Sequence, residues 1–240
     1  MEELANKLTD WIKGQVARAK RRGVVFGLSG GLDSAVVAVL CKRAFPDNTL
    51  ALIMPCHSSE SDIEHAGAVA VKFDIPTNTI DMEGVFSSLL KVLPTGNFEP
   101  DNTKLAEANL KSRLRMLALY YAATQLHYLV VGTGNKSEIS IGYFTKFGDG
   151  AADILPLGNL VKKQVQELAV YLDIPQEIIQ KPPSAGLWVG QTDEAEMGIT
   201  YDELDRYLLI GHAAEEVKKK IDARITASSH KRALPTVPPF

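Results

Sequence analysis

The chain has 240 residues, of which 45% are hydrophobic and 23% are charged, and its formal net charge at pH 7 is -3. This composition is typical of a globular domain with a sizeable core. A net negative charge argues against the positively charged surface by which proteins bind the phosphates of nucleic acid. The sequence shows no signal peptide, no apolar run of membrane-spanning length, and no C-x-x-C pair formed by Cys41 and Cys56. We therefore expect a soluble, cytoplasmic protein that binds neither nucleic acid nor membrane.

Predicted helices and strands alternate in the first half of the chain. An amphipathic helix is expected first, because Leu4, Leu8 and Ile12 recur on one face. Strands are then predicted over residues 24–28, 50–55 and 76–81, with helices over residues 35–45 and 58–73. This alternation favours an α/β fold with a mainly parallel sheet and helices on both faces.

The second half begins with a long helix, predicted over residues 103–126. Its apolar side chains are expected to face inward: Leu105, Leu110, Leu114, Leu117 and Tyr121. A fourth strand is predicted over residues 128–131, and residues 142–156 combine glycine, lysine and aspartate in a pattern typical of an irregular functional segment. A helix is predicted to follow and to end near residue 172. No linker interrupts the chain, so we expect one domain, residues 1–240.

The first strand leads into a glycine-rich turn that reads S-G-G-L-D-S and opens a helix. Glycines allow a phosphate to approach the backbone, and the helix N-terminus attracts anions. The Walker pattern and the G-x-G-x-x-G pattern are both absent here. The turn resembles the pyrophosphate-binding loop of ATP pyrophosphatases, and the alternative is a turn that binds nothing. The predicted phosphate-binding residues are Gly27, Leu28, Ser29, Gly30, Gly31, Leu32, Asp33 and Ser34.

The fourth predicted strand ends in a second polar turn, G-T-G-N-K-S-E. Carboxyl ends of parallel strands share one edge of a sheet, so Glu138 is expected on the same rim as Asp33. Two carboxylates together with ATP phosphates suit Mg²⁺. The alternative is that Glu138 only favours the N-terminus of a helix, and the spacing does not decide between these roles.

The motifs taken together resemble those of the NAD synthetases. S-G-G-L-D-S, G-T-G-N-K-S-E, F-T-K-F-G-D-G-A-A-D-I-L-P-L, K-P-P-S-A-G-L-W and G-Q-T-D-E occur in order along nearly the whole chain. Other pyrophosphate-loop enzymes share the first motif but not F-T-K-F-G-D-G. The resemblance implies a Rossmann-like fold of the adenine nucleotide alpha hydrolase type. It also implies a homodimer with deamido-NAD at the subunit interface, and a mobile loop over residues 181–200.

The resemblance also implies roles for individual residues. Besides the phosphate loop, the implied ATP contacts are Thr133, Lys162 and Ser184. The implied contacts to deamido-NAD are Arg113, Lys146, Asp153, His230 and Lys231. Asp33 and Glu138 would hold Mg²⁺, and the implied catalytic residues are Asp33, Lys146 and Lys162. Taken alone, Arg113 and residues 230–232 are typical of surface charges.

The implied reaction is the amidation of deamido-NAD with ammonia at the expense of ATP, the final step of NAD biosynthesis. The nicotinate carboxylate attacks the α-phosphorus and releases pyrophosphate, and ammonia then displaces AMP from the acyl-adenylate. Two alternatives stay open. One is another adenylating enzyme of the same fold, such as a transfer-RNA thiolase or GMP synthetase, although a thiolase needs reactive cysteines and a basic surface. The other is a regulator that holds ATP without turnover, which the predicted charged residues disfavour.

Overall fold

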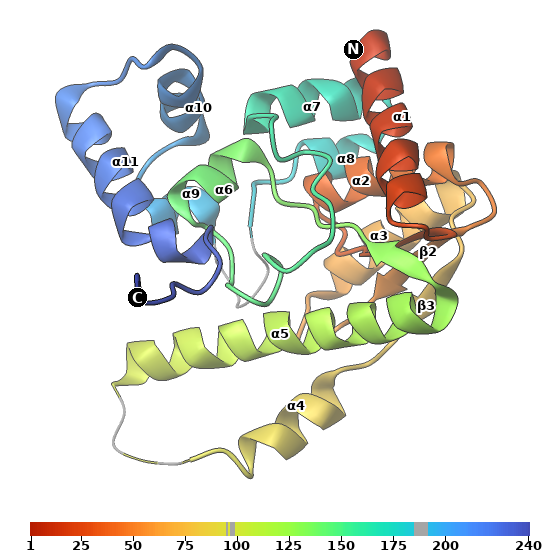
Figure 1. Ribbon diagram of the computed structural model, residues 1–240, viewed down its shortest axis with the longest axis horizontal. Coiled ribbons are helices and arrows are strands. Elements are labelled where there is room, and N and C mark those ends of the chain that lie inside the picture. Colours follow the sequence, from red (N-terminus) through yellow and green to blue (C-terminus); the bar gives the residue numbers. More distant parts are fainter. Residues whose placement is uncertain (95, 97–98, 185–191) are drawn as a thin grey trace.

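A parallel sheet forms the centre of the computed structural model, which describes residues 1–94, 96, 99–184 and 192–240 (Figure 1). The order of its four strands is β3-β2-β1-β4. The strands are β1 (Gly23–Gly27), β2 (Thr49–Ile53), β3 (Thr77–Thr79) and β4 (Tyr128–Val130). Val25 of β1 lies opposite Leu50 of β2 and Val130 of β4. The predicted α/β fold with a parallel sheet is confirmed, and the carboxyl ends of all these strands meet at one edge.

The α-helices in the described part of the chain pack on this sheet or lie beyond one edge of it. They are α1 (Glu2–Arg18), α2 (Leu32–Ala44), α3 (Glu60–Lys72), α4 (Glu83–Leu90), α5 (Pro100–Leu126), α6 (Lys136–Ile141), α7 (Lys162–Tyr171), α8 (Gln176–Ile179), α9 (Asp193–Met197), α10 (Tyr201–Ile210) and α11 (Glu215–Ala227), and a 3₁₀ turn η1 (Ser229–Lys231) follows. The prediction missed α4 and the helices after residue 172.

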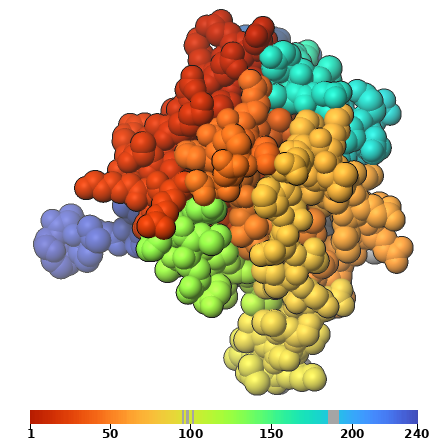
Figure 2. Space-filling view, turned by 90° about the vertical axis from the view of Figure 1, so that its right-hand side faces the viewer, coloured from red at the N-terminus to blue at the C-terminus, as the bar shows by residue number. Residues whose placement is uncertain are grey.

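Different helices cover the two faces of the sheet, because successive side chains of a strand point to opposite faces. Val24 and Phe26 pack with residues of α1, α2 and α7 on one face. Val25 and Val130 pack with α4 and α5 on the other. Figure 2 shows this separation, with α1 in red at the top and α4 in yellow at the bottom. Full burial of one such side chain contributes about 1.5–3 kcal/mol, so both faces stabilise the fold.

One part of the prediction for α5 is wrong. Leu114 is buried, but Leu105, Leu117 and Tyr121 have 54%, 59% and 71% of their surface exposed. The helix has 27 residues and rises about 1.5 Å per residue, so it is much longer than the strands that it crosses. Only one side of it packs on the sheet. Leu117 and Tyr121, four residues apart on another side, form an exposed apolar stripe, defined here as these two residues, and Leu105 lies apart from them near the start of the helix.

A smaller hydrophobic cluster lies beyond the sheet and packs α10 and α11 onto α6. Ile141 of α6, Leu204 of α10 and Ile221 of α11 are buried at its centre. Residues 142–156, predicted to be irregular, contain no helix or strand and join the sheet through one bridge between Val131 and Ile154. The cluster therefore places α10 beside the carboxyl edge of the sheet.

Candidate active site

The glycine-rich turn lies between β1 and α2, at the carboxyl edge of the sheet. Gly30 has a φ of 79°, and a Cβ there would come within 2.1 Å of the Asp62 carbonyl oxygen, so only glycine fits. The buried Ser34 hydroxyl donates to the Gly31 carbonyl (2.9 Å) and accepts from the Ser29 N–H (3.2 Å). These bonds hold the turn in shape before any ligand binds.

Three of the predicted residues meet beside this turn. The Lys162 ammonium forms an ion pair with Asp33 and lies 3.4 Å from Glu138 Oε1. The Lys162 side chain is only 4% exposed. Asp33 comes from the start of α2, Glu138 from α6 and Lys162 from the start of α7. The structure therefore brings together the predicted metal ligands and a predicted catalytic lysine, which we call the carboxylate–lysine cluster.

Asn135, which the sequence analysis did not single out, fixes two members of this cluster. Its side-chain amide donates to Asp33 Oδ1 (2.9 Å), and its side-chain oxygen accepts from the Glu138 N–H (3.0 Å). Glu138 Oε2 accepts from the Asn135 N–H (3.2 Å) and so completes a capping box at the start of α6. Glu138 thus lies on the same rim as Asp33 and also caps α6, while its role as a metal ligand stays a prediction. The N-x-x-E pattern, which is typical of a capping box, is the sequence signal that could have identified Asn135.

With both of its carboxyls ionised, the cluster would hold more negative than positive charge. Burial and the neighbouring Asp33 raise the pKa of Glu138 to about 8, although the Lys162 ammonium opposes this shift. A cation with two positive charges would offset the excess, so the donor set fits Mg²⁺. In the described ranges no group of three or more His, Cys, Asp or Glu side chains could hold a metal. Two carboxylates suffice for Mg²⁺ when phosphate oxygens and water supply the remaining ligands.

The raised pKa of Glu138 should make the stability of the ligand-free protein depend on pH. The usual pKa of this carboxyl is 4.5 and the folded-state pKa is about 8, so the folded state binds more protons between these values. The free energy of unfolding therefore falls as pH rises through this window, by roughly 3–4 kcal/mol between ~pH 5 and ~pH 8. The glutamine in Glu138→Gln does not titrate. The free energy of unfolding of this variant, measured with urea, should therefore fall less over the same pH range. Equal pH dependence in both proteins would contradict the assignment.

Tyrosines and a carboxylate from distant parts of the chain enclose the cluster. The Tyr201 ring lies 5.2 Å from the Lys162 ammonium, and the Tyr201 hydroxyl donates to Asp193 Oδ2 (2.9 Å). The Tyr143 hydroxyl lies 3.1 Å from Asp193 Oδ1. The sequence analysis assigned none of these three residues a role, and only the G-Q-T-D-E motif, which contains Asp193, pointed to this region.

A cavity of about 300 Å³ opens next to the cluster. Its walls include Thr133 and Glu138 from the region after β4, and Asp149 and Lys231 from two later segments. The predicted ATP contact Thr133 therefore lies on the same cavity as Glu138. Ser184, another predicted ATP contact, is exposed on the segment that follows α8.

Four of the five predicted deamido-NAD contacts are connected around residues 142–147. The Lys146 ammonium donates to the His230 carbonyl (2.6 Å), and Arg113 donates to the Lys146 carbonyl (3.3 Å). Lys231 donates to the carbonyls of Gly142 (2.9 Å) and Phe144 (2.8 Å), and burial lowers its pKa. Of these four residues, Lys231 lines the cavity, and the hydrogen bonds of the four join α5, the irregular segment and η1.

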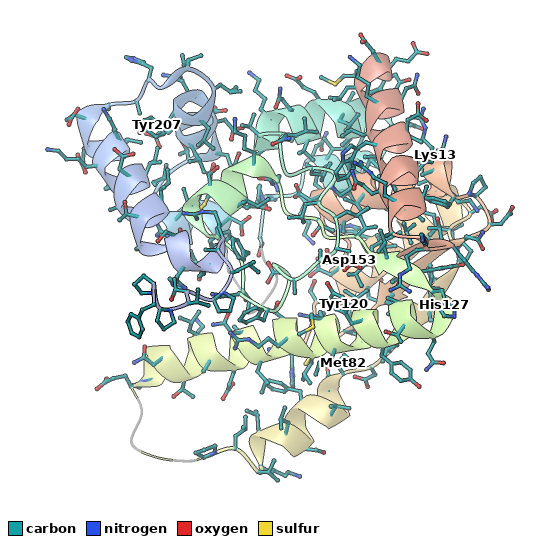
Figure 3. All side chains as sticks on the ribbon, in the orientation of Figure 1. Lys13, Met82, Tyr120, His127, Asp153 and Tyr207 are labelled. Atoms are coloured by element: carbon teal, nitrogen blue, oxygen red, sulfur yellow. The ribbon has the colours of Figure 1, made fainter. Side chains whose placement is uncertain are left out.

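The fifth, Asp153, has different neighbours. Its carboxylate accepts from the Val130 N–H (2.8 Å), and Tyr120 of α5 points toward it with its hydroxyl 3.4 Å from Oδ1 (Figure 3). Asp153 therefore ties the irregular segment to β4, while its side chain stays exposed.

The segment predicted to be a mobile loop lies partly outside the described residues, because 185–191 are not described. Its two ends are held close together, since the Asp193 N–H donates to the Pro183 carbonyl (3.0 Å). Lys181 forms an ion pair with Asp62, beside the phosphate loop. Residues 193–197 form α9, so this end of the stretch is helical.

Comparisons with known proteins agree with this arrangement. A family model described as NAD synthase matches residues 4–235. The chain is 48% identical to an NH(3)-dependent NAD(+) synthetase from Carboxydothermus hydrogenoformans, over 99% of this chain and 97% of the relative. It is 45% identical to the protein of the same name from Methanocaldococcus jannaschii, again over 99% of this chain and 97% of the relative.

Two solved structures are similar over nearly their whole length. An NMN synthetase from Francisella tularensis superposes with a TM-score of 0.93 at 40% identity, covering 100% of this chain and 98% of that one. An NH3-dependent NAD synthetase from Campylobacter jejuni superposes with a TM-score of 0.81 at 29% identity, covering 99% and 98%. Within the described residues, no helix is long and apolar enough to cross a membrane.

Proposed function

Because the chain belongs to the NAD synthase family, we propose that it converts deamido-NAD, ATP and ammonia into NAD, AMP and pyrophosphate. The enzyme is thus a ligase that forms a carbon–nitrogen bond. The observation that carries this proposal is the carboxylate–lysine cluster beside a preformed phosphate loop, at the carboxyl edge of the sheet. We further propose that residues 1–240 act as a single domain.

The reaction has two displacements. The nicotinate carboxylate attacks the α-phosphorus of ATP, and the bond from that phosphorus to the β-phosphate oxygen breaks, so that pyrophosphate leaves. Ammonia then attacks the carboxyl carbon of the acyl-adenylate, AMP departs, and the attacking nitrogen loses a proton. Neither step needs a nucleophilic side chain, so the protein acts by positioning and by stabilising charge.

The phosphate loop and Lys162 serve the first displacement. N–H groups of residues 29–34 and the N-terminus of α2 lie where the triphosphate would bind. The Lys162 ammonium is rigidly held and largely buried, so it neutralises charge that develops on phosphate oxygens without reorganising. Lys146 would contribute a second positive charge at the cavity, once it leaves the His230 carbonyl.

We propose Mg²⁺ as the metal of this site, with Asp33 and Glu138 as its protein ligands. Both carboxyls lie next to the Lys162 ammonium, and a divalent cation that displaces the proton from Glu138 would offset the two negative charges. The metal would bind phosphate oxygens of ATP and neutralise part of their charge. The protein's contribution is to hold the two carboxylates apart from solvent, through Asn135 and the capping box.

We also propose a homodimer in which the exposed apolar stripe of α5 contacts a second copy. The stripe contains two large side chains that are more than half exposed, Leu117 and Tyr121. Arg113, a proposed contact to deamido-NAD, lies four residues before Leu117 on the same side of the helix. A partner at this surface would therefore approach the residues proposed to hold the dinucleotide.

The dimer proposal predicts that a charged substitution in the stripe lowers the molar mass of the protein in solution. Wild-type protein should elute with twice the 26.2 kDa mass of the chain in light scattering. Leu117→Asp should shift the mass to that of one chain, because an aspartate buried in an apolar interface has a large desolvation cost. Val71→Asp, at another highly exposed apolar side chain on α3, is the control and should stay dimeric. A single-chain mass for the wild type would contradict the proposal.

One observation favours a second acceptor. The NMN synthetase from Francisella tularensis has a TM-score of 0.93, against 0.81 for the NAD synthetases from Campylobacter jejuni and Burkholderia pseudomallei. Nicotinic acid mononucleotide presents the same nicotinate carboxylate as deamido-NAD but lacks the adenylate half. The second candidate function is therefore amidation of this mononucleotide by the same two displacements.

An assay of products separates these functions. Purified protein is incubated with ATP, Mg²⁺ and ammonium chloride, and with deamido-NAD, nicotinic acid mononucleotide or no acceptor. We expect NAD, AMP and pyrophosphate in equal amounts with deamido-NAD, and no ATP consumption without an acceptor. Faster turnover of the mononucleotide would establish the second function. Formation of ADP and phosphate, or no turnover with either acceptor, would contradict both.

A further inference from the structure

The α10 helix contacts the Lys162 side chain from the side opposite the phosphate loop. The Tyr201 ring lies 5.2 Å from the Lys162 ammonium, a distance at which the ring face attracts a cation. The hydroxyl of the same tyrosine lies 3.4 Å from Glu138 Oε1. Tyr201 thus touches the lysine and one of its two carboxylate partners at once.

The Tyr201 hydroxyl is itself held by a buried carboxylate. It donates to Asp193 Oδ2 at 2.9 Å, and Asp193 is 4% exposed. The other oxygen of Asp193 lies 3.1 Å from the Tyr143 hydroxyl, and Tyr143 also lies 2.5 Å from Glu196 Oε2. The orientation of the Tyr201 ring is therefore fixed by Asp193, which in turn is fixed by residues of two segments.

The backbone of Lys162 is anchored to the same helix. Asp205 of α10 accepts from the Lys163 N–H (2.8 Å) and from the Ser137 hydroxyl (2.5 Å). The Ser137 hydroxyl in turn accepts from the Lys162 N–H (3.1 Å). A single helix therefore fixes both the backbone and the ammonium of the lysine, although lysine has a long stem with much rotamer freedom.

We propose that Tyr201 and Asp193 are positioning residues, which hold the Lys162 ammonium where it acts on the phosphates of ATP. This inference rests on the proposed function, in which Lys162 stabilises charge during the first displacement. A preorganised charge accelerates a reaction more than a mobile one, because no reorganisation is needed when the transition state forms. Loss of the Tyr201 hydroxyl or of the Asp193 charge should therefore slow turnover rather than weaken binding.

Tyr201→Phe and Asp193→Asn test the proposal, with Tyr207→Phe as the matched control. Tyr207 lies on the same helix (Figure 3), and its hydroxyl also donates to an aspartate, Asp222 (2.6 Å). It has no contact with Lys162 in the described structure. We expect kcat to fall about tenfold in the two test variants, while KM for ATP stays within about twofold. The control should keep the wild-type kcat.

The double variant and the reactivity of Lys162 give two further readouts. The double variant with Tyr201→Phe and Asp193→Asn should lose about as much kcat as either single variant, because both substitutions disrupt the same hydrogen bond between the two side chains. Acetylation of Lys162 by acetic anhydride, followed by mass spectrometry, should be faster in both variants than in the wild type. The exposed Lys163 is the internal reference, and its rate should not change.

The outcomes distinguish the failure of this inference from that of the proposed function. If the wild type makes no amidated product, the proposed function fails. If the wild type is active and Tyr201→Phe matches the Tyr207→Phe control in kcat and in Lys162 acetylation, the positioning role is overturned. The positioning role is also overturned if the fractional loss of kcat in a variant equals the fraction of that variant that is unfolded, as measured by thermal unfolding. Tyr201→Phe keeps the buried ring, so the test does not depend on Asp193→Asn folding.

Discussion

Replacing Lys162 by methionine is expected to lower kcat by about a thousandfold, the largest effect of any single substitution in this chain. Methionine nearly matches the length of the lysine stem but carries no charge. The ammonium that neutralises phosphate charge is then lost. Nearby carboxylates, Asp33 above all, raise the pKa of Lys162 against the effect of burial, so the wild-type side chain is charged at every pH of interest.

The same substitution should also destabilise the ligand-free protein, by about 3–5 kcal/mol, because Asp33 and Glu138 lose their buried counter-charge. Adding Glu138→Gln to Lys162→Met removes one of the two negative charges and should restore part of that stability without restoring activity. Kinetics and urea unfolding of both variants separate the two effects. Lys163→Met, at the exposed neighbour, is the control. Recovered activity in the double variant would show that Lys162 has only a structural role.

The second large effect is expected from the proposed metal ligands. Asp33→Asn and Glu138→Gln should each lower turnover about a hundredfold at low Mg²⁺, because an amide oxygen keeps the shape of the ligand but lacks its charge. Higher Mg²⁺ concentrations should restore part of the rate. Calorimetric binding of Mg²⁺ with α,β-methylene ATP should weaken in both variants, which gives a measurement independent of turnover.

Glu203→Gln is a matched control for the helix cap. Glu203 completes a capping box with Thr200 at the start of α10, as Glu138 does with Asn135 at the start of α6. Glutamine preserves such a box, so a loss of activity in Glu138→Gln alone reports on the charge at the site. Wild-type turnover at low Mg²⁺ in both Asp33→Asn and Glu138→Gln would refute the shared metal.

Local patterns were enough to predict the phosphate loop and the sheet. β1, β2 and β4 are short, largely buried apolar runs, whereas β3 is polar and exposed. The alternation of strands with helices permits few topologies. Gly30 could be recognised because the turn that it forms requires a residue without a Cβ. The capping signal at Asn135 and Glu138 is also local, since it spans only four residues. These features depend on contacts between near neighbours in sequence.

Only the tertiary structure decided which distant residues meet. Asp33 and Lys162 are separated by 129 positions, and no periodicity relates them; they meet because α2 and α7 both begin at the carboxyl edge of the sheet. Tyr201 reaches the lysine because a separate hydrophobic cluster packs α10 beside that edge. The exposure of Leu117 has a similar explanation. An amphipathic pattern marks an apolar face, but packing decides whether the rest of this chain covers that face.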